Sequence, residues 1–279
     1  MNWAGVFAVM RKDLATVLRN NGVRIPLLAA PIMILVVLPI LLVSGGDALV
    51  TSTPVPIEQL GGDAFENAFG GLDPQSAQDA TGVATTAGGW AVFVLEVFIA
   101  PLYLLVPLIV ATVIAADSFA GERERGTLEA LLHTPTTDEE LLTAKFLASW
   151  LPATVVAIGG FAVYCVVANA VAWPTLGRIF FPNTTWLVLA FWVAPGLAAL
   201  ALAVMTVVSS RVSSLQSAHQ VGSLLVLPIV LLLIAQVSGG VLLDTQLAIG
   251  MGAVVWLLGL VVLRGAGRRL RRETLAARL

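Results

Sequence analysis

Six long stretches without a single Asp, Glu, Lys or Arg constrain the fold of this chain more than any other feature of its sequence. A helix that crosses a bilayer needs roughly 17–25 predominantly apolar residues, and each stretch is long enough to supply them. The whole chain is 58% hydrophobic and 11% charged, whereas soluble domains carry about 25% charged residues. A membrane barrel would show short alternating segments instead of continuous apolar runs. The sequence therefore predicts an all-α, polytopic membrane protein and disfavours a soluble enzyme.

We expect six transmembrane helices. Their predicted ranges are 25–44, 92–116, 146–169, 186–208, 221–237 and 247–263. The distribution of positive charge tests this division independently, because Lys and Arg near span ends collect on the cytoplasmic side. Alternate non-membrane segments carry 14 and 1 of the 15 Lys and Arg residues. Both ends of the chain are basic, which predicts an even number of crossings with both ends in the cytoplasm of a multi-pass cell-membrane protein.

The segments outside the spans differ in character. Residues 1–24 place apolar side chains at helical spacing beside Arg and Lys, a pattern typical of a helix in the cytoplasmic interface; a plain basic flank is the alternative. Residues 45–90 form an outer loop with six acids and no Lys or Arg. Residues 264–279 form a basic cytoplasmic tail, which we interpret as a topology anchor rather than a nucleic-acid site. We treat 1–279 as a single transmembrane domain.

Tryptophans at the predicted span ends agree with this division, because their amphipathic rings prefer the membrane interface. Trp150 and Trp186 are two of them, whereas Trp192 and Trp256 lie deeper and are expected to pack between helices. The one cysteine, Cys165, rules out a disulfide within the chain.

The cytoplasmic loop at 117–145 has internal structure of its own. Gly126 interrupts the helix that leaves the second span, and Thr127 can cap a short helix with leucines on one face. Pro135 ends that helix, and Thr137 with Glu140 has the spacing of a capping box for the next one. A short helix whose apolar face has no core of its own is suited to docking a soluble partner.

This loop resembles the signature loop of type-2 ABC transporter permeases, through the string GERERGTLEALLHTP and the following DEELLTAKFLA. The resemblance is specific over about 30 residues, and the six-span layout extends it over the chain. In that family the loop forms a coupling helix that sits in a groove of the ATPase subunit. The resemblance implies that eight residues engage this partner: Glu122, Arg125, Gly126, Thr127, Leu128, Glu129, Leu132 and Pro135.

The resemblance also implies the partners and cofactors. We expect two copies of an ABC ATPase subunit and a second permease copy, as a homodimer or a heterodimer, with ATP and Mg bound by the ATPase. This chain has no G-x-x-x-x-G-K-[ST] loop and no segment large enough for an ATPase domain. It also has no zinc-protease or nucleophile-elbow motif. We therefore expect a permease subunit of an exporter, with no cofactor or metal bound by the chain itself and an unidentified substrate.

Glu96 is the clear ionisable residue inside a span. A charge there usually faces a cavity or a partner, so Glu96 is a candidate to line the translocation path; a structural position near the interface is the equal alternative. Gln236 and Asn169 pose the same question more weakly. Two further hypotheses stay open: a secondary transporter that uses Glu96 as an ion site, and a membrane scaffold that recruits an ATPase without transport.

Overall fold

The computed structural model describes residues 7, 10–11, 21–52, 91–117, 138–209, 215–237, 241 and 243–269. Within these residues the chain is helical, without strands, and it contains six helices long and apolar enough to cross a membrane. Their apolar parts are Leu27–Gly45, Val94–Ala116, Thr143–Leu176, Thr184–Val208, Gln216–Gln236 and Thr245–Gly265. The predicted all-α fold with six spans is confirmed. Most of the predicted interfacial helix at 1–24 lies outside the described residues, and Asn21 to Arg24 belong to the first long helix.

Most spans are built from more than one helical segment. The first comprises α2 (Asn21–Ile32), the π-helix η1 (Met33–Val37) and α3 (Leu38–Ser52), and the second comprises the π-helix η2 (Phe93–Phe98), α7 (Ile99–Tyr103) and α8 (Leu105–Ala116). The third is the single helix α11 (Asp138–Leu176), which is longer at both ends than the predicted span. The fourth comprises α12 (Thr184–Val188), the π-helix η4 (Leu189–Val193) and α13 (Ala194–Ser209). The fifth comprises α14 (Leu215–Ser223), the 3₁₀ helix η5 (Leu224–Val226) and α15 (Leu227–Val237), and the sixth is α16 (Thr245–Arg269).

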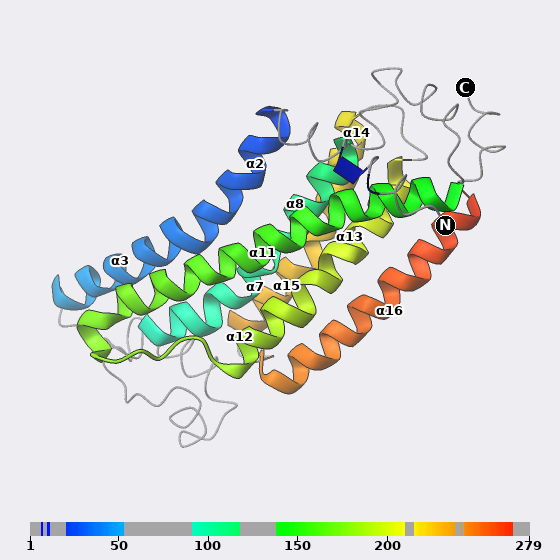
Figure 1. Cartoon of the computed structure of the whole chain (residues 1–279). Helices are drawn as coiled ribbons and strands as arrows, with labels where there is room; N and C mark the ends of the chain where they lie inside the picture. The colour runs from blue at the N-terminus through cyan, green and yellow to red at the C-terminus, as the bar shows by residue number, and fades with distance from the viewer. Residues whose placement is uncertain are drawn as a thin grey trace.

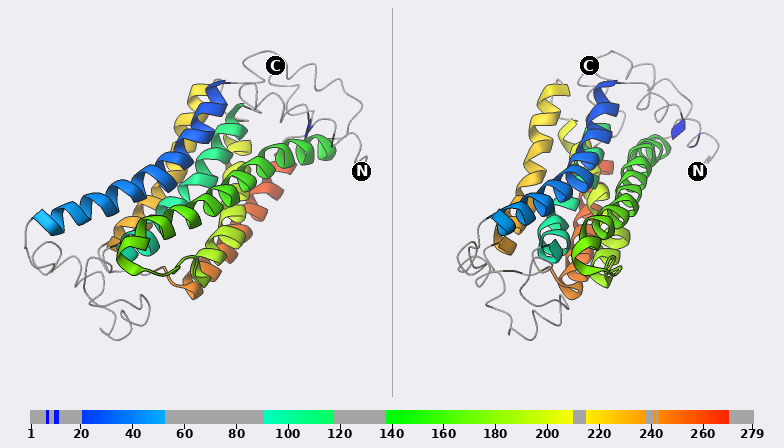
Figure 2. Two further views of the ribbon diagram at one scale, coloured as in Figure 1. Left: turned by 60° about the vertical axis from the view of Figure 1, so that its left-hand side comes forward. Right: turned by 90° about the vertical axis from the view of Figure 1, so that its left-hand side faces the viewer.

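The second and fourth spans form the centre of the bundle, since 72% and 67% of the residues in an apolar 18-residue stretch of each are buried, against 17–28% for the other four. Figure 1 shows α8 and α13 enclosed by α11, α16, α14 and α2. The start of α2, the start of α11, α14 and the end of α16 lie at one end of the bundle, which we call the base, and α3, α12 and the start of α16 lie at the other, which we call the far end (Figures 1 and 2). Large apolar side chains cover the outward faces of the outer helices, as expected for a surface in contact with lipid.

Small residues allow the central helices to approach closely, as is common between transmembrane helices. A Cβ atom at Gly252 would lie 2.3 Å from the indole ring of Trp192, and one at Gly196 would lie 2.8 Å from that of Trp256. The indole of Trp192 donates to the carbonyl of Ile249, and that of Trp256 donates to the carbonyl of Trp192. The fourth and sixth spans are therefore joined by reciprocal contacts, which confirms that these two tryptophans pack between helices.

Candidate functional site

The predicted coupling residues Glu122, Arg125, Gly126, Thr127, Leu128, Glu129, Leu132 and Pro135 lie outside the described residues. What the structure describes is the pair of helices from which the loop emerges. Asp117, directly after α8, is 3% exposed, and Lys145, near the start of α11, is 2% exposed. Both charged side chains are thus buried at the base of the bundle, and neither is without an interaction. The loop is connected on each side to a packed part of the structure.

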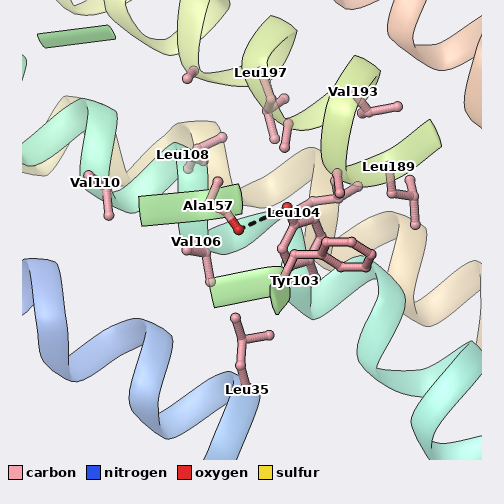
Figure 3. Packing of buried hydrophobic residues seen from close by; sticks show 14 of the residues in the cluster. Leu35, Tyr103, Leu104, Val106, Leu108, Val110, Ala157, Leu189, Val193 and Leu197 are labelled. Carbon is pink, nitrogen blue, oxygen red and sulfur yellow. Dashed lines mark hydrogen bonds between the residues drawn. The ribbon is translucent and has the colours of Figure 1, made fainter. Parts of the chain in front are cut away.

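The two helices that carry the loop are joined along their length. The hydroxyl group of Tyr103 in the second span donates to the carbonyl of Ala157 in the third, 3.2 Å away, and Figure 3 shows this bond among buried aliphatic side chains. Nearer the far end, the hydroxyl group of Tyr164 donates to the carbonyl of Leu95. Since buried polar groups in a membrane have no water to bond, such pairs fix neighbouring helices to each other. A displacement of the loop would move both spans together.

Glu96 lies in the π-helix η2 at the far end of the second span, where its side chain is half-buried. Asn183 lies beside it, and Oδ1 of Asn183 accepts from the amide of Trp186 and so caps α12. Glu96 is therefore next to the connection between the third and fourth spans. This position does not place it on a path, and the role predicted for Glu96 stays a prediction.

An aromatic cluster surrounds the same end of η2. Trp186 is at its centre, stacked on Tyr164 at a centroid distance of 4.9 Å and in contact with Phe181 and Tyr103 at 5.0 and 5.5 Å. Trp186 is 1% exposed, so the expectation that it lies at the lipid interface is wrong. The indole is inside the bundle because its N–H donates to the carbonyl of Glu96, 3.1 Å away, which replaces the water that an interfacial tryptophan would use.

Three consecutive carbonyl groups of η2 each accept a hydrogen bond from a different span. Leu95 accepts from Tyr164 on the third span, Glu96 from Trp186 on the fourth, and Val97 from Nε2 of Gln236 on the fifth, at 3.0 Å. We call this arrangement the far-end junction.

The sequence explains why one of these carbonyls is free to accept. The π-helix ends at Phe98 and an α-helix begins at Ile99, so the amide that would meet Val97 at α-helical spacing belongs to residue 101. Residue 101 is Pro101, which has no amide hydrogen. The side chain of Gln236, from the fifth span, donates to Val97 instead. A proline inside a predicted span was the sequence signal for this junction, and sequence reasoning did not use it.

Asn169, the other weak candidate, is part of the connection that follows the third span. Its side chain donates to the carbonyls of Cys165 and Phe181 and accepts from the amides of Phe180 and Phe181. It thereby folds the connection back onto α11, after Gly177 with φ 61° has ended that helix. Its role in the described structure is architectural.

No group of three or more His, Cys, Asp or Glu side chains within the described ranges is arranged to hold a metal ion. The features above are helix contacts and mechanical connections rather than a catalytic constellation.

In a comparison with known families, the family described as ABC-2 family transporter protein matches residues 7–251. No curated protein matches the chain.

Proposed function

Because the chain belongs to the ABC-2 family of transporter proteins, we propose that it is the permease subunit of an ATP-driven exporter, powered by a separate ABC ATPase. The match over residues 7–251, which includes all of the loop at 117–145, is the observation that carries this proposal. A multi-pass membrane protein of this family is a transport subunit rather than a catalytic one, and it associates with an ABC ATPase. The direction of transport, the stoichiometry of the complex and the residues that contact the ATPase are part of the proposal.

The proposed orientation puts the base in the cytoplasm. The loop at 117–145 and the basic residues that precede α2 and end α16 would then face the ATPase, in agreement with the distribution of Lys and Arg. ATP and Mg would be bound by that partner, since this chain has no phosphate-binding loop. Two ATPase copies and a second permease copy, identical or similar, would complete the transporter in the cell membrane.

The structure supports the loop as the point at which force enters. Its two ends continue into α8, in the central and most buried span, and into α11, the longest helix. The side chains of Asp117 and Lys145, at the two ends of the loop, are buried in the bundle. A loop connected to exposed, weakly packed helices would dissipate a displacement locally, whereas this one transmits it to the centre.

Copurification tests the proposal. The detergent-solubilised chain, expressed with its candidate ATPase, is captured by affinity and examined for the ATPase. We expect recovery with the wild type and loss with Leu132→Asp, because a charge replaces an apolar side chain of the predicted coupling helix. Leu275→Asp, the same change in the predicted cytoplasmic tail, is the matched control and should retain the ATPase. Absence of any ATPase with the wild type under gentle conditions would remove the main support for the exporter.

The ion-coupled alternative depends on Glu96. Glu96 lies beside Asn183, which caps α12, and this position favours a structural role. Glu96→Gln separates the two hypotheses because an amide stays polar but cannot carry a charge. The scaffold alternative predicts ATPase capture without ATP-dependent movement of any substrate in sealed vesicles.

A further inference from the structure

The far-end junction contains one bond that differs from the others. Tyr164 and Trp186 come from spans that pack closely on the second span, whereas Gln236 comes from the fifth, in which only 17% of an apolar 18-residue stretch is buried. Apolar packing alone holds a transmembrane helix weakly to its neighbours, because lipid tails are as apolar as the neighbouring side chains. A side-chain hydrogen bond therefore contributes a large part of what holds the far end of α15 in place.

We propose that Gln236 is the latch that closes the far end of the transport path between the second and fifth spans, by donating to the carbonyl that Pro101 leaves without an amide. The proposal rests on the proposed function in one respect: the far end must face the outside, where the substrate would leave. Gln236 is then a positioning residue. It contacts backbone and sets how readily the exit opens.

The amide oxygen of Gln236 is also consistent with a latch that must open. Gln236 is 2% exposed, and its Oε1 atom has no hydrogen-bond partner among the residues that the structure describes. A buried amide oxygen without a partner destabilises the state that contains it, and water would relieve this cost when the far end opens. The carbonyl of Val97 would gain water at the same moment. The contact of the fifth span with the junction is thus held by one bond and opposed by this one atom, which keeps the two states close in free energy.

The position of the bond agrees with a gate. Gln236 is the penultimate residue of α15, and Val97 lies near the start of the second span, so the bond joins the two helices at the far end. Ile229 lies seven residues before Gln236, on the same helix face and about 10 Å deeper, and it is 5% exposed within the core. A reagent from outside reaches Ile229 only when the far end of the fifth span moves away.

The test measures the accessibility of that position. Ile229→Cys is introduced with Cys165→Ala, which removes the one native cysteine, and the full chain in intact cells is treated with a membrane-impermeant maleimide. We expect Gln236→Ala to raise the labelling rate about tenfold, which corresponds to about 1.4 kcal/mol. Gln220→Ala changes the same residue type at the base end of the same span, where the side chain is exposed, and should leave the rate unchanged.

A double variant separates the latch from a simple packing role. Pro101→Ala restores an amide at residue 101, so that the stranded carbonyl has a backbone donor and no longer needs Gln236. Labelling of Pro101→Ala with Gln236→Ala should therefore return to within about threefold of the wild type, a coupling that independent sites would not show. Gln236→Asn, which shortens the amide and leaves a smaller cavity, provides the same comparison if the alanine variant is not produced.

Two results would overturn the latch. One is wild-type labelling in Gln236→Ala and Gln236→Asn; the other is a double variant that labels as fast as Gln236→Ala, which would show that a cavity rather than a lost donor opens the helices. Because labelling needs no ATPase, its outcome is independent of the copurification experiment. A working latch in a chain that captures no ATPase would refute the exporter alone.

Discussion

Gly252→Ala tests the contact between the fourth and sixth spans. The added Cβ would lie 2.3 Å from Cδ1 and Nε1 of Trp192, where ordinary contacts are 3.4–4 Å, so the indole must retreat by more than 1 Å. Its Nε1–O distance to Ile249 is already 3.2 Å, and the bond would be lost at a cost of about 1 kcal/mol. Disturbing the Trp192–Trp256 pair, with centroids 6.1 Å apart, adds about 0.5–1.5 kcal/mol.

The expected loss of stability is therefore about 2 kcal/mol, reduced by the helix preference of Ala over Gly, which is roughly 0.5–1 kcal/mol. Gly250→Ala measures that preference alone, since nothing lies within 4 Å of its Cβ position two residues earlier on the same helix. In thermal unfolding of the detergent-solubilised chain, followed by tryptophan fluorescence, we expect the Gly252→Ala midpoint about 4–8 °C below that of Gly250→Ala. Equal midpoints would refute the close approach of α16 to Trp192. Replacing the indole with a smaller side chain, by Trp192→Leu in the Gly252→Ala background, should recover part of the difference in midpoint.

Three further predictions concern other parts of the bundle. Asn169→Leu should destabilise the chain by about 3 kcal/mol or more, because it removes several hydrogen bonds and leaves the amides of the connection at 180–181 unpaired. Thermal unfolding measures this loss of stability. A loss under about 1 kcal/mol would contradict the role of this side chain. Glu96→Gln should retain ATP-dependent transport in sealed vesicles, and complete loss of transport would favour ion coupling instead. Gly160→Ala should destabilise the chain by about 1–3 kcal/mol and lower its unfolding midpoint, because the added Cβ would lie 2.8 Å from Leu35. Gly159→Ala is the control, since its Cβ meets nothing within 4 Å. Equal midpoints for the two variants would argue against the contact between the first and third spans.

The architecture could be predicted because it depends on a local property. A run of apolar residues long enough to cross a bilayer must become a helix there, whatever its neighbours are, and this is why six spans and an all-α fold followed from the sequence. The family followed from a second local property, the string at 117–145, whose charged and leucine-rich pattern has few other uses. Both depend on residues adjacent in the chain.

The far-end junction could not be predicted in the same way, because its partners are distant in sequence. Gln236 is 139 residues from Val97 and Trp186 is 90 from Glu96, so nothing near either residue indicates the other. Trp186 shows the consequence: its place at a span end predicted the lipid interface, and a carbonyl from another span brings it inside. Pro101 is the one local clue, since a proline in a span always leaves a carbonyl that needs a donor. Pro101 thus indicates that a hydrogen-bond donor is needed, but it does not identify the residue that supplies the donor.

The second span connects the two ends at which the proposals act. At the base it continues through the buried Asp117 into the loop that we propose couples to the ATPase, and at the far end its carbonyl at Val97 accepts from Gln236, the proposed latch. Between these points it is the most buried span, but it is not one regular helix: a π-helix gives way to an α-helix near Pro101, and α7 gives way to α8 at Leu104. A packed helix transmits a push along its axis, and a break in its hydrogen-bond pattern is where it can bend. If a displacement of the loop shifts α8, the shift reaches the junction at this break, where the Gln236 bond is the side-chain hydrogen bond that joins the fifth span to the second. The exit would then open when the force transmitted along the second span breaks the Gln236 bond. Pro101→Ala removes the break in this span. The labelling rate of Ile229→Cys should therefore depend less on the nucleotide supplied to the complete transporter.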